Sequence, residues 1–168
     1  MKQHFIKLLE QNNWVFESPA QDAFFSTPER YKAIPADLRE FLSSFHALRN
    51  RNDTMWFLSS SDYAENNEDG FKWNEFELMS LEAAVGDEEW TKAIQSFWSQ
   101  HLPIFISVEA NYQYMAYCID GLHSGKYVFA EEPEFESTSV VASNIEHAID
   151  WLILTILRND VQASDANT

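Results

Sequence analysis

Two clusters of acidic residues are the side chains whose types and spacing could do chemistry in this chain. The first lies in the stretch 59–70, and the second surrounds Pro133 and Phe135. Carboxylates this close in sequence could ligate a cation, act as general acid and base, or orient a basic partner protein. The members are Asp62, Glu65, Glu68 and Asp69 in the first cluster, and Glu131, Glu132, Glu134 and Glu136 in the second.

The first cluster comes close to the pattern of a calcium-binding loop. With the glycine of this stretch in the sixth position of such a loop, Glu65, Asn67 and Asp69 take the first, third and fifth positions. The twelfth position must supply a bidentate carboxylate, and in this chain it is Phe76, with a glutamate on either side. No pair of flanking EF-type helices is evident. We therefore expect no dedicated metal site, and at most weak, incidental cation binding.

The segment GLHSGKY (121–127) has some features of a phosphate-binding loop. That loop needs four residues between its two glycines, and a Ser or Thr after the lysine to present a hydroxyl to magnesium. Here three residues separate Gly121 from Gly125, and Tyr127 follows the lysine. The segment also joins two predicted strands instead of leading into a helix, so we predict a hairpin turn.

The cysteine and the five histidines show no catalytic or metal-ligand spacing. Cys118 lies in the apolar run YMAYCI without a basic neighbour in sequence, so we expect a small core residue. His101 precedes Leu102-Pro103 at the predicted end of a helix, where a partly positive imidazole would suit the dipole. We expect no cofactor. A catalytic carboxylate pair among the 27 acidic residues stays an open alternative, because sequence does not show proximity in space.

Five stretches show the apolar spacing or the start signal of a helix. In IPADLREFLSSF (34–45), Pro35 can occupy the first helical position, and the apolar residues recur at i, i+3, i+4 and i+7. A later helix starts at Asp87 and carries an apolar stripe from Trp90 to Trp98. The last one opens with the capping-box pattern SNIE (143–146). The predicted helices cover 3–12, 36–47 and 75–84, and two more begin at 87 and 143.

Four apolar runs, 54–58, 102–109, 112–120 and 125–132, predict strands. The last three are separated by short turns and have apolar residues on both faces, so helices should cover the sheet on each side, wholly or in part. The chain shows no internal repeat and no linker. We predict a single α+β domain over residues 1–158, followed by a flexible, solvated tail over 159–168.

Charge is distributed unevenly along the 168 residues, which carry a formal net charge of −16. Residues 1–51 contain seven basic and six acidic side chains, a net charge of +1, whereas residues 52–168 contain four and 21, a net charge of −17. This balance disfavours binding to nucleic acid or to an anionic membrane. It is typical of an acidic, highly soluble protein, and it equally suits docking to a basic partner.

Two further features of the sequence indicate the cellular compartment of the protein. A single cysteine cannot form an internal disulfide, and no segment has the apolar length of a signal peptide or a membrane span. We expect a soluble cytoplasmic protein with no membrane association.

The opening helix IPADLREFLSSF, the segments MWFLSSSDY (55–63) and FKWNEFE (71–77), the run LPIFISVEANYQYMAYCID (102–120) and the stretch 131–152 together resemble the SUKH superfamily. This family contains relatives of the fungal Smi/Knr-type cell-wall regulator and bacterial immunity proteins. The resemblance extends over residues 28–157. It implies a compact α+β fold with a central, largely antiparallel sheet and helices packed around it. It also implies non-enzymatic binding, since many bacterial members neutralise a nuclease or deaminase toxin by binding it.

The leading functional expectation is therefore an immunity protein that binds a basic toxin domain. A regulatory scaffold without a toxin is the alternative, and a metal-assisted hydrolase using the acidic loops is a third reading. The two acidic clusters would steer the partner, with Tyr63 and Trp73 as aromatic anchors. The opposing interpretation is that both clusters are solvated loops whose neighbouring aromatic side chains fold back into the core. The residue pattern leaves these two interpretations open.

Overall fold

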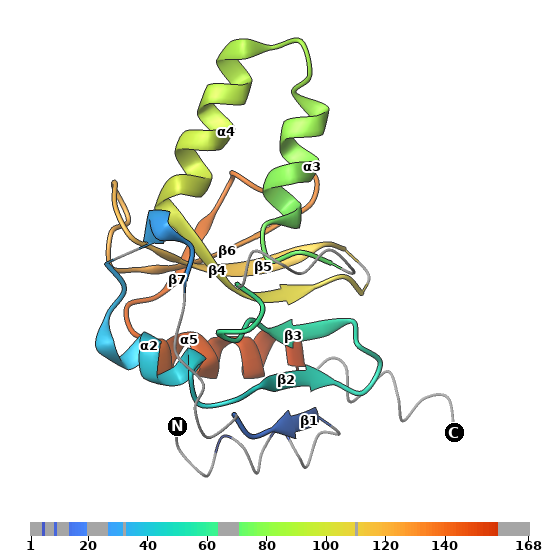
Figure 1. Ribbon diagram of the computed structural model, residues 1–168, viewed down its shortest axis with the longest axis vertical. Helices are drawn as coiled ribbons and strands as arrows, with labels where there is room; N and C mark the ends of the chain where they lie inside the picture. The colour runs from blue at the N-terminus through green and yellow to red at the C-terminus, as the bar shows by residue number, and fades with distance from the viewer. Residues whose placement is uncertain are drawn as a thin grey trace.

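The computed structural model describes residues 5, 9, 14–19, 27–31, 33–63, 71–109 and 111–157. These residues form one seven-stranded antiparallel sheet and four α-helices, which confirms the expected single α+β domain (Figure 1). The strands are β1 (Trp14–Glu17), β2 (Ala47–Asn50), β3 (Met55–Phe57), β4 (His101–Ser107), β5 (Gln113–Cys118), β6 (Tyr127–Glu131) and β7 (Ser139–Ala142). The helices are α2 (Ala36–Leu42), α3 (Glu75–Ala83), α4 (Glu88–Gln100) and α5 (Ile145–Leu152), with a 3-10 turn η1 (Glu29–Tyr31) and a π-helical turn η2 (Ile153–Leu157).

The order of the strands in the sheet is the order of the strands in the chain, β1 to β7. Each neighbouring pair is antiparallel, so the sheet is one continuous meander. The helices are inserted into this meander: α2 connects β1 to β2, and α3 with α4 connects β3 to β4. The α3–α4 hairpin is consequently a single excursion that leaves the sheet and returns to it directly, because β4 begins at the residue after α4.

One face of the sheet packs against the α3–α4 hairpin. Trp56, Ile106 and Tyr114 lie opposite one another across β3, β4 and β5 and therefore share this face. Phe76 of α3 and Trp98 of α4 pack on Tyr114, with ring centroids 5.7 and 5.0 Å away. This hairpin base is the first of two helical layers on the sheet.

The opposite face packs against α2 and α5. Phe57 and Phe105 are paired across β3 and β4 on this face, and Phe41 of α2 lies 5.5 Å from the ring of Phe57. Trp151 of α5 lies 4.9 Å from the ring of Phe129 on β6. Figure 1 shows α2 and α5 on one side of the sheet and the α3–α4 hairpin on the other. The prediction that helices cover both faces, at least in part, is confirmed.

The opening helix is shorter than predicted. It ends at Leu42, and the hydroxyl groups of Ser43 and Ser44 then donate to the carbonyl oxygens of Arg39 and Phe41. Side-chain bonds of this kind compete with helix continuation. The residues from 47 onward form β2 instead, because they pair with β1 on one side and β3 on the other. No local pattern in the sequence predicts β1, β2 or β7.

Two helix starts test the capping predictions. Asp87 caps α4 as expected, since its side chain accepts a hydrogen bond from the Trp90 amide at 2.9 Å. α5 begins one residue later than the pattern SNIE predicts: its cap is Asn144, whose side-chain oxygen accepts from the His147 amide at 2.9 Å. None of the described helices combines the length and the apolar character that crossing a bilayer requires.

Candidate functional site

The ten predicted partner-binding residues do not converge on one described site. Three of them, Glu65, Glu68 and Asp69, lie outside the described residues, as does the first half of the calcium-like loop. The residue at the twelfth position of that loop, Phe76, is buried in the core. The other seven residues are described below.

Asp62 closes a local turn. Its carboxylate accepts hydrogen bonds from the backbone amide of Ser59 at 2.6 Å and from the Ser59 hydroxyl at 2.8 Å. Burial raises the pKa of the Asp62 carboxyl, and the hydrogen bonds from Ser59 and the nearby His46 offset part of that rise. The Asp62 carboxylate is therefore hydrogen-bonded within the chain, and its role in the structure is to hold this turn together.

The two predicted aromatic anchors lie in or against the core. Tyr63 is 1% exposed and donates a hydrogen bond to the carbonyl oxygen of Pro103 at 2.6 Å, so the expectation that it is exposed is wrong. Trp73 is half-buried between Tyr31 and Tyr63, with ring centroids 5.8 and 6.0 Å away, and Arg30 lies over its ring. Both aromatic side chains therefore pack in or against the core, although acidic residues lie near them in the sequence.

The second acidic cluster is divided between surface and core. Glu131, Glu132 and Glu134 are exposed, whereas Glu136 accepts a hydrogen bond from the indole N–H of Trp98 at 2.9 Å. Phe135 is buried beneath the cluster, where it stacks on the ring of α3's phenylalanine at 4.6 Å. For Tyr63 and Phe135 the structure therefore supports the interpretation in which aromatic side chains fold back under solvated acids.

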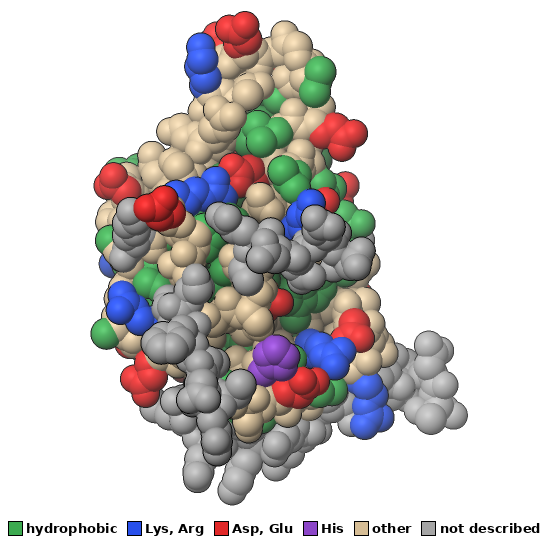
Figure 2. Space-filling model, in the orientation of Figure 1, with side chains coloured by type: hydrophobic (Ala, Val, Ile, Leu, Met, Phe, Trp, Pro, Cys, Tyr) green, Lys and Arg blue, Asp and Glu red, His purple; other side chains and the backbone are tan. Residues whose placement is uncertain are grey.

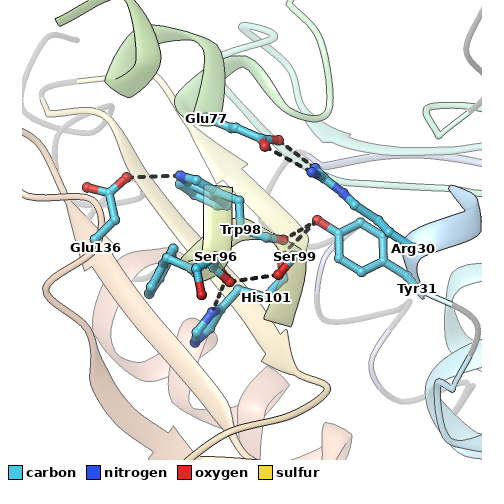
Figure 3. A network of polar contacts seen from close by, with 9 residues as sticks. Arg30, Tyr31, Glu77, Ser96, Trp98, Ser99, His101 and Glu136 are labelled. Carbon is cyan, nitrogen blue, oxygen red and sulfur yellow. Dashed lines mark hydrogen bonds and ion pairs between the residues drawn. The ribbon is translucent and has the colours of Figure 1, made fainter. Parts of the chain in front are cut away.

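A partly buried polar network ties the base of the α3–α4 hairpin to η1 (Figure 3). The guanidinium of Arg30 donates to both carboxylate oxygens of Glu77, at 2.9 and 2.5 Å, and Glu77 is 6% exposed. The hydroxyl of Tyr31 donates to the carbonyl oxygens of Trp98 and His101, at 2.7 and 3.1 Å. Buried polar groups that are all bonded in this way fix one geometry for the packed elements.

His101 has a different role from the one predicted for it. Its Nδ1 lies 2.7 Å from the carbonyl oxygen of Phe97, which can only accept, so this nitrogen carries a proton. Burial lowers the pKa of the His101 imidazole, and His123 lowers it further. The ring also stacks on Phe97 at 3.9 Å. His101 therefore ends α4 as a packed, neutral donor and not as a partly positive charge.

The described residues bring together no reactive group that stands out chemically. Burial raises the pKa of the Cys118 thiol to about 11, which keeps it protonated and weakly nucleophilic at neutral pH. Within the described ranges, no three His, Cys, Asp or Glu side chains cluster so as to hold a metal ion. The segment 121–127 is the connection between β5 and β6, with Gly121 and Gly125 in the left-handed region, as the hairpin prediction requires.

Sequence reasoning missed the far end of the α3–α4 hairpin. Val85 in the turn is 82% exposed, and Trp90 in the first turn of α4 is 47% exposed. The signal is present in the apolar stripe of α4, which continues from the buried Trp98 and Ile94 to the exposed Trp90. Figure 2 shows hydrophobic and acidic side chains together on this projecting part of the surface.

Comparisons with protein-family models, with curated proteins and with solved structures give no match to this chain.

Proposed function

We propose that this protein is a non-enzymatic binding domain of the SUKH type that acts as an immunity protein, binding and neutralising a basic toxin domain that acts on nucleic acid. The observation that carries the proposal is the concentration of charge: residues 52–168 have a net charge of −17. Exposed carboxylates of this region lie both at Glu131, Glu132 and Glu134 and on the α3–α4 hairpin.

The physical argument concerns competition for a basic surface. A nuclease or deaminase domain needs positive charge to hold a phosphate backbone. An acidic protein can occupy the same surface, and long-range attraction speeds their encounter.

The direct test is protection against a basic toxin domain of the nuclease or deaminase class. Expression of that domain in a sensitive bacterium should stop growth, and co-expression of this protein should restore it. Purified toxin domain and immunity protein should associate with a rate constant that falls about tenfold or more between about 50 and 500 mM salt. Binding without protection would favour the regulatory scaffold instead. Absence of binding, or a rate that does not change with salt, would overturn the proposal.

A further inference from the structure

The free end of the α3–α4 hairpin exposes apolar side chains that the fold leaves without a covering element. The described residues include six large hydrophobic side chains that are exposed, and three of them, Leu78, Val85 and Trp90, belong to this hairpin. Single exposed apolar side chains scattered over a surface are normal, but half of them on one two-helix projection are a concentrated patch.

The apolar residues of α3 occupy two faces of the helix. Phe76, Glu77, Ser80 and Ala84 are buried and face the core. Leu78 and Leu81 lie on a different side of the helix, where Leu81 still packs against the core, and Val85 follows in the turn after α3. Leu78 is 38% exposed and Leu81 is half-buried, and exposure rises to 82% at Val85.

The stripe of α4 leads to the same end of the hairpin. Trp98, Ile94 and Trp90 are spaced at four-residue intervals and lie on one side of the helix. Trp98 and Ile94 are each 1% exposed, whereas Trp90 is 47% exposed. Figure 1 shows why burial ends there: α3 and α4 extend away from the sheet, so no strand lies beneath their connecting turn. Gly86, at φ +93°, permits this turn, and a Cβ there would meet open space.

The patch is surrounded by negative charge. Glu82, Asp87, Glu88 and Glu89 are exposed around it, and Lys92 is the basic side chain of the same segment, 78–92. Three of these acids also serve the fold, because they lie at the start of α4, where negative charge suits the helix dipole and Asp87 is the cap.

Glu82 is the acid that the fold does not explain. It lies in the last turn of α3, where the dipole favours a basic side chain, and that turn contains none. An acid in this position is unfavourable for the folding of α3. Local choices that oppose folding concentrate at functional sites.

We propose that the far end of the hairpin is the docking surface of this protein, and that its occupant is an amphipathic basic segment of the partner protein. Apolar side chains of that segment would cover Trp90 and Val85, and its lysines or arginines would face Glu82, Glu88 and Glu89. Aromatic side chains at the centre of a patch and charges at its rim are the arrangement of protein-binding hot spots. This inference rests on the proposed function, for which it names the site.

The first experiment uses the toxin domain as the partner. Trp90→Ala should weaken the affinity by about tenfold or more. Leu122→Ser is the matched control, because Leu122 is 94% exposed on the β5–β6 connection and lies outside the hairpin. Its affinity should equal that of the unaltered protein. If the toxin domain binds all three proteins equally, the docking site is wrong and the proposed function stands. If it binds none of them, the proposed function itself fails.

The second experiment separates binding from stability. Glu82→Lys should weaken binding to the toxin domain, while its thermal midpoint should equal or exceed that of the unaltered protein, because the dipole of α3 is better compensated. Weaker binding together with a lower midpoint, or unchanged binding, would overturn the role given to Glu82.

The third experiment uses a defined probe. A synthetic peptide of lysine and leucine arranged with helical amphipathicity is titrated into the isotope-labelled protein, and the amide resonances are followed. Perturbations should centre on residues 78–92 and disappear with a scrambled peptide of the same composition. Perturbations centred on 131–136, equal effects of the scrambled peptide, or no binding would each overturn the proposal.

Discussion

Tryptophan and acidic side chains are buried and hydrogen-bonded at the base of the α3–α4 hairpin, but exposed at its far end. At the base, Trp98 is buried, donates its indole N–H to Glu136 and packs on Tyr114. At the far end of the same helix, Trp90 is 47% exposed, and the acids Glu82, Glu88 and Glu89 of the same segment are exposed to solvent. At the base, an aromatic and an acidic side chain are buried or bonded to each other and stabilise the fold. At the far end, side chains of the same types are exposed and are not required for folding.

The largest expected difference between the two ends is the loss of stability when the tryptophan at each end of α4 is replaced by alanine. Trp98→Ala removes a fully buried side chain and leaves a cavity, so the free energy of unfolding should fall by about 3–5 kcal/mol. Trp90→Ala should change it by no more than about 0.5 kcal/mol. Urea denaturation of both variants measures the difference. Similar losses for the two variants would mean that the far end is part of the core.

The ion pair at the base should matter more than an exposed one. Arg30→Met leaves the buried carboxylate of Glu77 without its partner and should cost about 1–3 kcal/mol of unfolding free energy. Arg49 offers a matched control, since its pairs with Glu17 and Asp53 are solvent-exposed. Arg49→Met should cost less than about 1 kcal/mol. Equal costs would show that the network does not hold the hairpin to η1.

His101, at the base of the hairpin, should make the stability of the fold depend on pH. The folded-state pKa of His101 lies below its ordinary value of 6.5, because burial favours the neutral ring. Its contribution to stability is therefore complete above the unfolded-state pKa, near 6.5, and is lost as the pH falls through the lower folded-state pKa. The unaltered protein should lose stability on acidification from neutral pH, and His101→Gln should lose less. Parallel pH profiles of the two proteins would contradict this role.

The smallest expected effect is the change in stability when the charge is altered at the carboxyl end of α3 or at the amino end of α4. Glu82→Lys should raise the free energy of unfolding by about 0.3–1 kcal/mol, because it places a cation at the carboxyl end of α3. Glu88→Gln removes an acid from the favourable end of α4 and should lower stability by a similar amount. Denaturation at low ionic strength measures both changes. A loss of stability in the Glu82 variant would show that this acid has a structural role.

Much of the fold could be predicted from periodicity. The apolar spacing of α4 and the apolar runs of β4 to β6 are long, so local pattern and final structure agree. β2 and β7 each have four residues and exist because neighbouring strands pair with them. A pairing of this kind leaves no local signal, and the pattern of serine side-chain bonds that ends α2 is equally invisible before the fold is known.

The candidate site was harder to predict than the fold. Tyr63 stands among polar and acidic residues, which is typical of a surface, but its ring reaches the core and its hydroxyl finds the carbonyl oxygen of Pro103. Trp90 stands in a regular helical stripe, which is typical of a core, but the stripe extends beyond the sheet. Sequence pattern gives the face of a helix. Where along that face burial ends depends on the length of the element packed against it.

The central claim is that the hairpin presents an exposed aromatic side chain within a negative field, and selective quenching of tryptophan fluorescence tests it most directly. All six tryptophans belong to the described residues, and Trp90 is the exposed one. The emission lost in Trp90→Phe isolates its signal. Caesium should quench this component more strongly than iodide, and added salt should reduce the difference. Equal quenching by the two ions, stronger quenching by iodide, or a component shielded from both would contradict the account.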